Sequence, residues 1–102
     1  MSELVIYESK ERIALITINR PEKMNALSND LVAALRDAFI KYKNSDDQCA
    51  ILTSSGDKAF SVGADIKDPP TDPDLWECMP GVGVIIDKPV VAAIAGYCVG
   101  GA

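Results

Sequence analysis

A stripe of apolar residues at helical spacing, set between shorter apolar runs, most constrains how this chain can fold. The residues that recur every four positions are Leu27, Leu31, Leu35 and Phe39, with Ala34, Ala38 and Tyr42 beside them. This spacing places their side chains on one face of a helix. Ser28 can cap the start of that helix, and Asp30 lies in its first turn. Lys41 and Lys43 lie in its last turn. We therefore predict an amphipathic helix that buries one face.

Two segments before this helix are typical of strands. Residues 4–7 are β-branched and aromatic, and residues 9–11 are polar and suit a hairpin turn. Residues 12–19 carry apolar side chains on both faces, which predicts a strand that is covered on both sides. The turn and the two flanking segments together predict a hairpin.

Further apolar runs follow the helix. Residues 49–53 and 90–95 are nearly continuous apolar runs, as in buried parallel strands. Residues 68–74 hold three prolines and three aspartates, which excludes a helix or a central strand, and residues 75–79 suit a short helix. This order of elements indicates an α/β fold with crossover connections.

The composition excludes several classes of function. The chain has 102 residues, which suits one domain, and a formal net charge of −5. No basic patch stands out, so we expect no nucleic-acid partner. The sequence contains no histidine. A Ser-His-Asp or Cys-His mechanism therefore cannot be assembled from this chain alone.

The cysteines and the ends of the chain indicate a cytoplasmic protein. Cys49, Cys78 and Cys98 match neither a zinc ribbon nor a disulfide framework, and we expect reduced, mostly buried thiols. The N-terminus lacks a basic stretch followed by an apolar run, so no signal peptide is predicted. The longest nearly apolar run, residues 90–102, is shorter than the roughly 20 residues of a membrane-spanning helix. We expect no membrane partner.

Several charged and apolar side chains could bind ligands, although each has a plainer interpretation. The acidic residues that could bind Mg²⁺ or Ca²⁺ are Asp65, Asp68, Asp72, Asp74 and Glu77. Their spacing does not match an EF-hand loop, which favours a solvated loop, and we predict no metal site. Lys23, Lys58 and Lys67 could contact phosphates or simply lie at the surface. Trp76 and Met79 could line an apolar pocket or belong to the core.

Two segments rich in glycine and small residues carry the strongest chemical indication. They are residues 60–67 and 96–102, each of which follows a predicted strand. Such turns let a backbone approach a ligand closely and direct N–H groups at an anion or a polarised carbonyl. Two converging N–H groups form an oxyanion hole, which needs no histidine. Two structural turns would also explain the pattern, and neither segment is a nucleotide-binding motif.

Three segments together resemble the crotonase family, also called the enoyl-CoA hydratase/isomerase superfamily. Residues 18–27 are INRPEKMNAL, residues 59–67 are AFSVGADIK, and residues 88–102 are KPVVAAIAGYCVGGA. They occur in the family's order and at about its spacing, and the resemblance covers nearly the whole chain. It implies a crotonase-like spiral of repeated ββα units, of which this chain would hold the first repeats, and assembly as a homotrimer or homohexamer.

The resemblance also implies the ligand and the residues that bind it. The ligand is an acyl-CoA thioester, and coenzyme A is part of this substrate, so no separate cofactor is expected. The backbone N–H groups of Ala64 and Gly101 would form the oxyanion hole for the thioester oxygen. The positions implied to contact substrate or coenzyme A are Lys23, Asn25, Ala26, Val62, Ala64, Asp65, Ile66, Lys67 and Gly101.

The reaction depends on residues that the resemblance places beyond Ala102. Family hydratases use two glutamates as acid and base, both expected after the glycine run. We therefore expect residues 1–102 to be the N-terminal part of a single crotonase-like domain, and to be inactive alone. An enoyl-CoA hydratase is the favoured activity. The alternatives are an enoyl-CoA isomerase or another activity of the superfamily, a non-catalytic acyl-CoA-binding or assembly module if Ala102 is the true terminus, and an α/β domain without a ligand.

Overall fold

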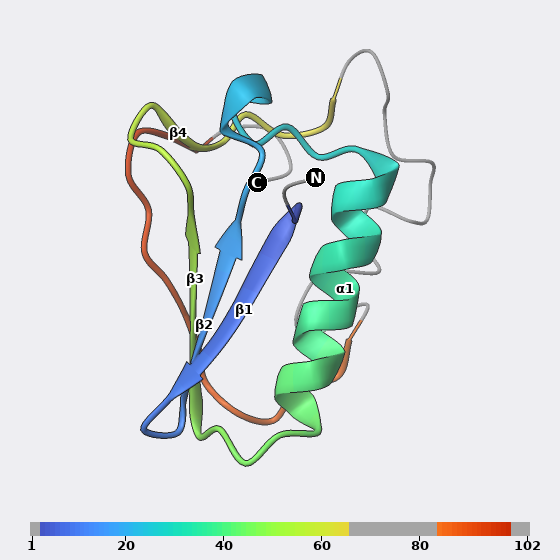
Figure 1. Ribbon diagram of the computed structural model, residues 1–102, viewed down its shortest axis with the longest axis vertical. Helices are drawn as coiled ribbons and strands as arrows, with labels where there is room; N and C mark the ends of the chain where they lie inside the picture. The colour runs from blue at the N-terminus through green and yellow to red at the C-terminus, as the bar shows by residue number, and fades with distance from the viewer. Residues whose placement is uncertain (1–2, 66–83, 99–102) are drawn as a thin grey trace.

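The computed structural model describes residues 3–65 and 84–98 and shows a helix packed against one face of a sheet (Figure 1). In chain order the elements are β1 (Val5–Lys10), β2 (Ile13–Ile18), the 3₁₀ helix η1 (Pro21–Lys23), α1 (Asn29–Lys43), β3 (Cys49–Ser54), β4 (Ala59–Ser61), β5 (Val90–Ala92) and β6 (Tyr97–Cys98). The predicted α/β class is confirmed. Residues 68–74 and 75–79, predicted as a loop and a short helix, lie outside the described residues.

The strands form two sheets that differ in size. The larger has the order β1-β2-β3-β5, in which β1 and β2 are antiparallel and the other neighbours are parallel. The smaller consists of β4 and β6, which run parallel. Helix α1 connects β2 to the parallel strand β3, which is the predicted crossover connection.

The hairpin between β1 and β2 turns later than predicted. Lys10 pairs with Ile13, so the loop holds only Glu11 and Arg12. Both residues have positive φ angles, 53° and 65°. A two-residue hairpin loop of this kind follows the right-handed twist of its strands. Pairing of the strands therefore extends β1 through residues 9 and 10, so the prediction of a turn at residues 9–11 is wrong for these two.

Helix α1 is confirmed, with the predicted cap. The Ser28 side chain accepts a hydrogen bond from the Leu31 N–H at 3.3 Å, and Asp30, Lys41 and Lys43 lie in the end turns. Leu27, which we included in the helical stripe, lies just before the helix. It is buried in the same core but forms a bridge to Ala64.

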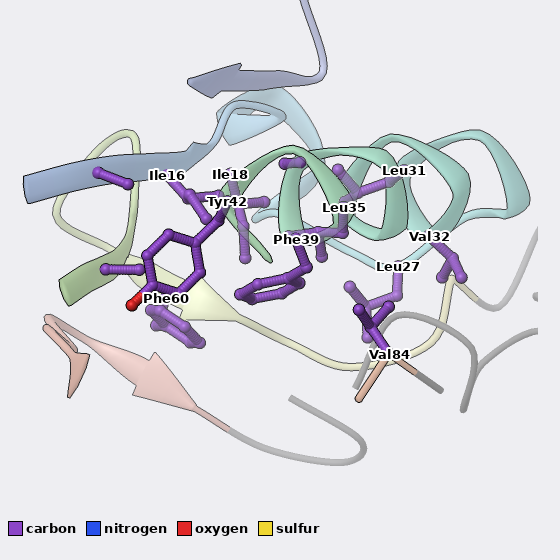
Figure 2. Packing of buried hydrophobic residues seen from close by; sticks show 13 residues of the cluster. Ile16, Ile18, Leu27, Leu31, Val32, Leu35, Phe39, Tyr42, Phe60 and Val84 are labelled. Carbon is purple, nitrogen blue, oxygen red and sulfur yellow. The ribbon is translucent and has the colours of Figure 1, made fainter. Parts of the chain in front are cut away.

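The hydrophobic core lies between α1 and one face of the large sheet (Figure 2). From β2, alternate residues Ala14, Ile16 and Ile18 point into it, each at most 2% exposed. The helix contributes a buried row, which is Leu31, Val32, Leu35, Ala38, Phe39 and Tyr42. Alternate side chains of the strand and the side chains that recur every 3.6 residues along the helix thus pack against each other at one interface.

The opposite face of the sheet corrects two predictions. Ile13 is 42% exposed and Leu15 is half-buried, so β2 is not covered on both sides by the described residues. Strand β5 has only three residues, and Val91 and Ile94 are 54% and 53% exposed. An apolar run alone therefore did not indicate burial here, because β5 lies at an edge of the sheet.

The cysteines and the helices bear on two further predictions. Cys98 is exposed and Cys49 is half-buried, so the expectation of mostly buried thiols is wrong for the described cysteines. Cys78 lies outside the described residues. Among helices of the described residues, none has the length and apolar character needed to cross a membrane.

Candidate functional site

Asn25 joins the connection between β2 and α1 to the segment from the end of β3 to the start of β4. Its side chain is 1% exposed, and its backbone is left-handed with φ 56°. The side-chain oxygen accepts from the Arg20 N–H at 2.8 Å. The side-chain amide donates to the carbonyls of Ser55 and Ala59 at 3.1 and 3.0 Å. Residues 23–26, which are predicted to contact coenzyme A, are therefore held against the turn after β3 and the first residue of β4.

Ser61 links this loop to the first glycine-rich segment. Its hydroxyl is fully buried and donates to the Asn25 carbonyl at 2.8 Å. The same oxygen accepts from the Gly63 N–H at 3.1 Å. Gly63 has φ 89°, a conformation that side chains other than glycine's rarely tolerate. The turn that leads to Ala64 is therefore fixed by one buried hydroxyl and one glycine.

The bridge between Leu27 and Ala64 sets the direction of the Ala64 N–H. The Leu27 N–H donates to the Gly63 carbonyl at 2.7 Å, and the Asp65 N–H donates to the Leu27 carbonyl at 2.9 Å. In this parallel pattern the residue between two bonded neighbours directs its own N–H away from the partner segment. Ala64 is exposed, and within residues 3–65 and 84–98 no group accepts from its N–H.

The small sheet brings the two glycine-rich segments together. β4 and β6 run parallel, with Ala59 paired to Tyr97 and Ser61 paired to Cys98 across a register irregularity. Ala64 lies three residues after Ser61, and Gly101 lies three residues after Cys98. Gly101 itself lies outside the described residues.

Arg20 and Asp65 form an ion pair beside Ala64. Arg20 donates from one guanidinium nitrogen to the Asp65 carboxylate at 2.7 Å and to the Ala26 carbonyl at 3.0 Å. The two charged side chains are only 16% and 12% exposed. The Asp65 carboxylate, which the resemblance assigns to coenzyme A, thus contacts a cation of its own chain.

The structure brings most of the described candidate residues into two adjacent segments. The Val62 N–H donates to the Met24 carbonyl at 3.3 Å, so residues 23–26 lie beside residues 62–65. Lys23 is exposed at the end of η1, and Ala26 is buried. Ile66 and Lys67 lie outside the described residues.

Lys58 and the acidic residues are the remaining side chains that the sequence offers for ligand binding. Lys58 is exposed and lines a cavity of about 240 Å³ with Pro21, Met24 and Gly56 among its neighbours. This cavity is smaller than the roughly 300 Å³ at which ligand pockets begin. Within the part of the chain that the structure describes, no group of three metal-binding side chains is present.

Sequence reasoning gave no role to Arg20 or Ser61. Both lie inside the quoted motifs. Ser61 is a polar residue between the apolar Phe60 and Val62, and that contrast could have marked it as a buried hydrogen-bonding group. Arg20 lies between Asn19 and Pro21 and carries no such signal. The partner of Arg20, Asp65, is 45 residues away in sequence, and the partner of Ser61, Asn25, is 36 residues away.

Comparison with known proteins gives consistent results. The family described as Enoyl-CoA hydratase/isomerase matches residues 8–102. The chain is 36% identical to (E)-benzylidenesuccinyl-CoA hydratase of Thauera aromatica, over 95% of the chain and 41% of that protein. It is 35% identical to crotonyl-CoA hydratase of Syntrophomonas wolfei, over 97% of the chain and 42% of that protein. It thus spans about two-fifths of the length of these relatives.

Solved structures agree with the sequence relatives. A carnitinyl-CoA dehydratase from Mycobacterium avium 104 superposes with a TM-score of 0.77 at 33% identity, over 93% of this chain and 39% of that one. An enoyl-CoA hydratase from Thermoplasma volcanium gives 0.74 at 32% identity, over 94% and 42%. The crotonase-like fold of the N-terminal part is therefore shown.

Proposed function

This chain belongs to the enoyl-CoA hydratase/isomerase family, and on that premise we propose that it supplies the thioester-binding part of an enoyl-CoA hydratase. The protein would add water across the 2,3-double bond of an enoyl-CoA. Relatives named as CoA-thioester hydratases support this activity. The glycine-rich segments would hold the thioester carbonyl, and residues 23–26 and 62–67 would contact coenzyme A.

The chemistry explains why two N–H donors suffice for this part of the site. When water adds to C3 and loses a proton, the double-bond electrons move to C2 and on to the thioester oxygen, which becomes an enolate oxygen. A proton then adds to C2 and restores the carbonyl. Each donor aimed at that oxygen contributes about 3 kcal/mol to the transition state. Neither donor needs a functional side chain.

The direction of the Ala64 N–H is the observation that carries the proposal. It points away from Leu27, because the bridge bonds to Leu27 use Gly63 and Asp65. The parallel pairing of Ser61 with Cys98 supports Gly101 as the second donor, since Gly101 follows Cys98 at the same interval. The two strands that precede Ala64 and Gly101 in sequence, β4 and β6, run parallel.

The Asn25 and Asp65 side chains would act indirectly in ligand binding. Asn25 uses its side-chain amide on the Arg20 N–H and the Ser55 and Ala59 carbonyls, so we propose that it meets coenzyme A through its backbone. Asp65 would position the loop through its ion pair with Arg20. Lys23 is exposed and would contact phosphate as a point charge.

Hydration of crotonyl-CoA by the protein at its native length tests the proposal, followed as loss of the enoyl thioester absorbance. Ala64→Pro removes the N–H, while Ala64→Gly keeps it. We expect kcat of the proline variant to fall about 10²–10³-fold and that of the glycine variant to stay within about threefold. The bridge bonds to Leu27 use neither the Ala64 N–H nor its carbonyl, so the loop should persist.

Each contrary outcome points to a different conclusion. Full kcat in the folded Ala64→Pro variant would reject this donor. Acyl-CoA binding without hydration by the unaltered protein would reject the hydratase and favour an isomerase or a non-catalytic acyl-CoA-binding module. Absence of acyl-CoA binding would reject the proposed ligand.

A further inference from the structure

Gly96, the first residue of the second glycine-rich segment, lies in close contact with the backbone that precedes β4. Its φ is 78°, and a Cβ built on it would lie under 3.0 Å from three backbone atoms of the two residues that precede β4. Those atoms are the Lys58 carbonyl oxygen and carbon and, at 2.8 Å, the Asp57 oxygen. A backbone carbonyl cannot move aside as a flexible side chain can, so only glycine fits at this position.

This contact lies where β6 joins β4. The residue after Gly96, Tyr97, donates its N–H to the same Lys58 carbonyl at 3.0 Å. Tyr97 then pairs with Ala59, and Cys98 pairs with Ser61. The close approach of Gly96 thus sets the distance between the start of β6 and the start of β4.

We propose that Gly96 is a positioning residue: the absence of a Cβ at this position lets β6 lie against β4, the strand that leads to the proposed donor Ala64. The inference rests on the proposed function. β4 leads to Ala64, and in sequence β6 leads to Gly101, the second proposed donor; the two strands pair directly after Gly96, with an irregularity of register between Ala59 and Ser61. A Cβ at residue 96 would push β6 off β4, while residues 23–26 and 62–65 would keep their contacts with each other.

Gly56, in the turn between β3 and β4 and outside the proposed binding residues, provides a matched control. Gly56 also has a positive φ, 82°, but a Cβ there would meet only the Pro21 Cβ at 3.6 Å, an ordinary contact. Gly56→Ala therefore carries the same type of conformational strain as Gly96→Ala without the collision. A second variant, Gly96→Asn, keeps the collision but lowers the strain, because asparagine tolerates the left-handed conformation.

The test measures kcat and KM for crotonyl-CoA hydration, with the protein at native length and below the melting temperature of every variant. We expect kcat to fall about a hundredfold in Gly96→Ala and in Gly96→Asn, since a misplacement of about 1 Å can cost that much. KM should change less than about threefold in both, because ground-state binding uses mainly the other segment. Gly56→Ala should keep kcat within about threefold.

Each other result decides against the inference. Unchanged kcat in folded Gly96→Ala would show that β6 position does not matter. Recovery of kcat in Gly96→Asn would assign the loss to strain alone, and equal losses in Gly56→Ala would assign it to general destabilisation. Unfolding of both Gly96 variants would make Gly96 a folding residue only. In each case the unaltered protein still hydrates crotonyl-CoA, whereas failure of that reaction overturns the proposed function as well.

Discussion

At the scale of single residues, buried polar side chains hold the site together. The Asn25 side chain links the β2–α1 connection to the turn and strand that follow β3, and Ser61 links the Asn25 carbonyl to the glycine turn. Both are at most 1% exposed. A buried polar group without hydrogen-bond partners lowers the stability of the fold, because it has lost its hydrogen bonds to water. With partners, it fixes one particular arrangement of the groups around it. These residues therefore fix the loop geometry without needing to touch a ligand.

Replacement of Asn25 should show this cost directly. Asn25→Ala leaves the Arg20 N–H and the Ser55 and Ala59 carbonyls without their side-chain partner. We expect the free energy of unfolding to fall by about 3 kcal/mol in urea titrations. Asn44→Ala, at an exposed position after α1, should change it by less than about 0.5 kcal/mol. Equal effects at the two positions would contradict the role given to Asn25.

Asp47 is another buried polar residue, and its partners are two hydroxyl groups of β1. Its carboxylate is 6% exposed and accepts hydrogen bonds from Ser9 at 2.5 Å and from Tyr7 at 2.6 Å. The Ser9 and Tyr7 hydroxyls hold the pKa of Asp47 below its usual value. Burial and the hydrogen bond to Asp47 raise the pKa of Tyr7. The pair thus favours an ionised carboxylate beside a neutral phenol.

The sign of these shifts predicts the pH dependence of stability. A carboxyl whose folded pKa is lowered stabilises the fold above its unfolded pKa, about 3.9, and loses that contribution as pH falls through its folded pKa. Asp47→Asn should therefore destabilise the protein near neutral pH, and its difference from the unaltered protein should shrink below about pH 4. Urea titrations across that range measure it. A constant difference would contradict the shift. Asp46→Asn, an exposed neighbour, is the control.

At the scale of elements, Lys88 joins the end of α1 to the start of β5. Its ammonium donates to the carbonyls of Tyr42, Ser45 and Asp47 at 2.7, 3.1 and 2.7 Å. It also lies 4.3 Å from the centre of the Tyr42 ring. A cation is favoured at a helix C-terminus, where the last carbonyls have no partner within the helix. Lys88 therefore caps α1 from a segment 45 residues along the chain.

Loss of this cap should loosen α1 and β5 together. For Lys88→Met we expect the free energy of unfolding to fall by about 2 kcal/mol, because three carbonyls lose a charged donor. Amide exchange should speed up in the last turn of α1 and in β5. Lys43→Met, an exposed lysine in the same turn, should cost less than about 0.5 kcal/mol. Faster exchange confined to α1 would argue against the link to β5.

At the scale of the whole molecule, one face of the large sheet remains partly apolar and exposed. Ile13 and Val91 lie on this face, 42% and 54% exposed, and Leu15 and Ile51 are half-buried there. No element within residues 3–65 and 84–98 packs over them. The opposite face, against α1, holds the core.

We expect residues 1–102 expressed by themselves to bind a hydrophobic dye and to aggregate or melt without a sharp transition. Exposed apolar surface on a sheet favours both outcomes. The double variant Ile13→Lys and Val91→Lys should raise solubility, because it alters the exposed face and leaves the core face intact. A sharp two-state melt of the unaltered piece, without dye binding, would contradict the prediction.

The sequence by itself determined the local elements and the family. The four-residue repeat and the Ser28 cap predicted α1, and apolar strand runs predicted β2 and β3, because these signals depend only on neighbours along the chain. The order of the three motifs identified the fold and the candidate donor at Ala64. The hairpin turn was placed too early, and β5 was predicted to be buried, because pairing and burial depend on distant strands.

The tertiary structure alone decided how the site is held. Three contacts join residues that are 37 to 45 positions apart in sequence. They are the ion pair of Arg20 with Asp65, the bridge of Leu27 to Ala64, and the close approach of Gly96 to the backbone before β4. No local pattern specifies such pairs, since they form only when segments distant in sequence pack together. The sequence could indicate candidate donors, but only the packing shows what directs the Ala64 N–H and what keeps β6 against β4.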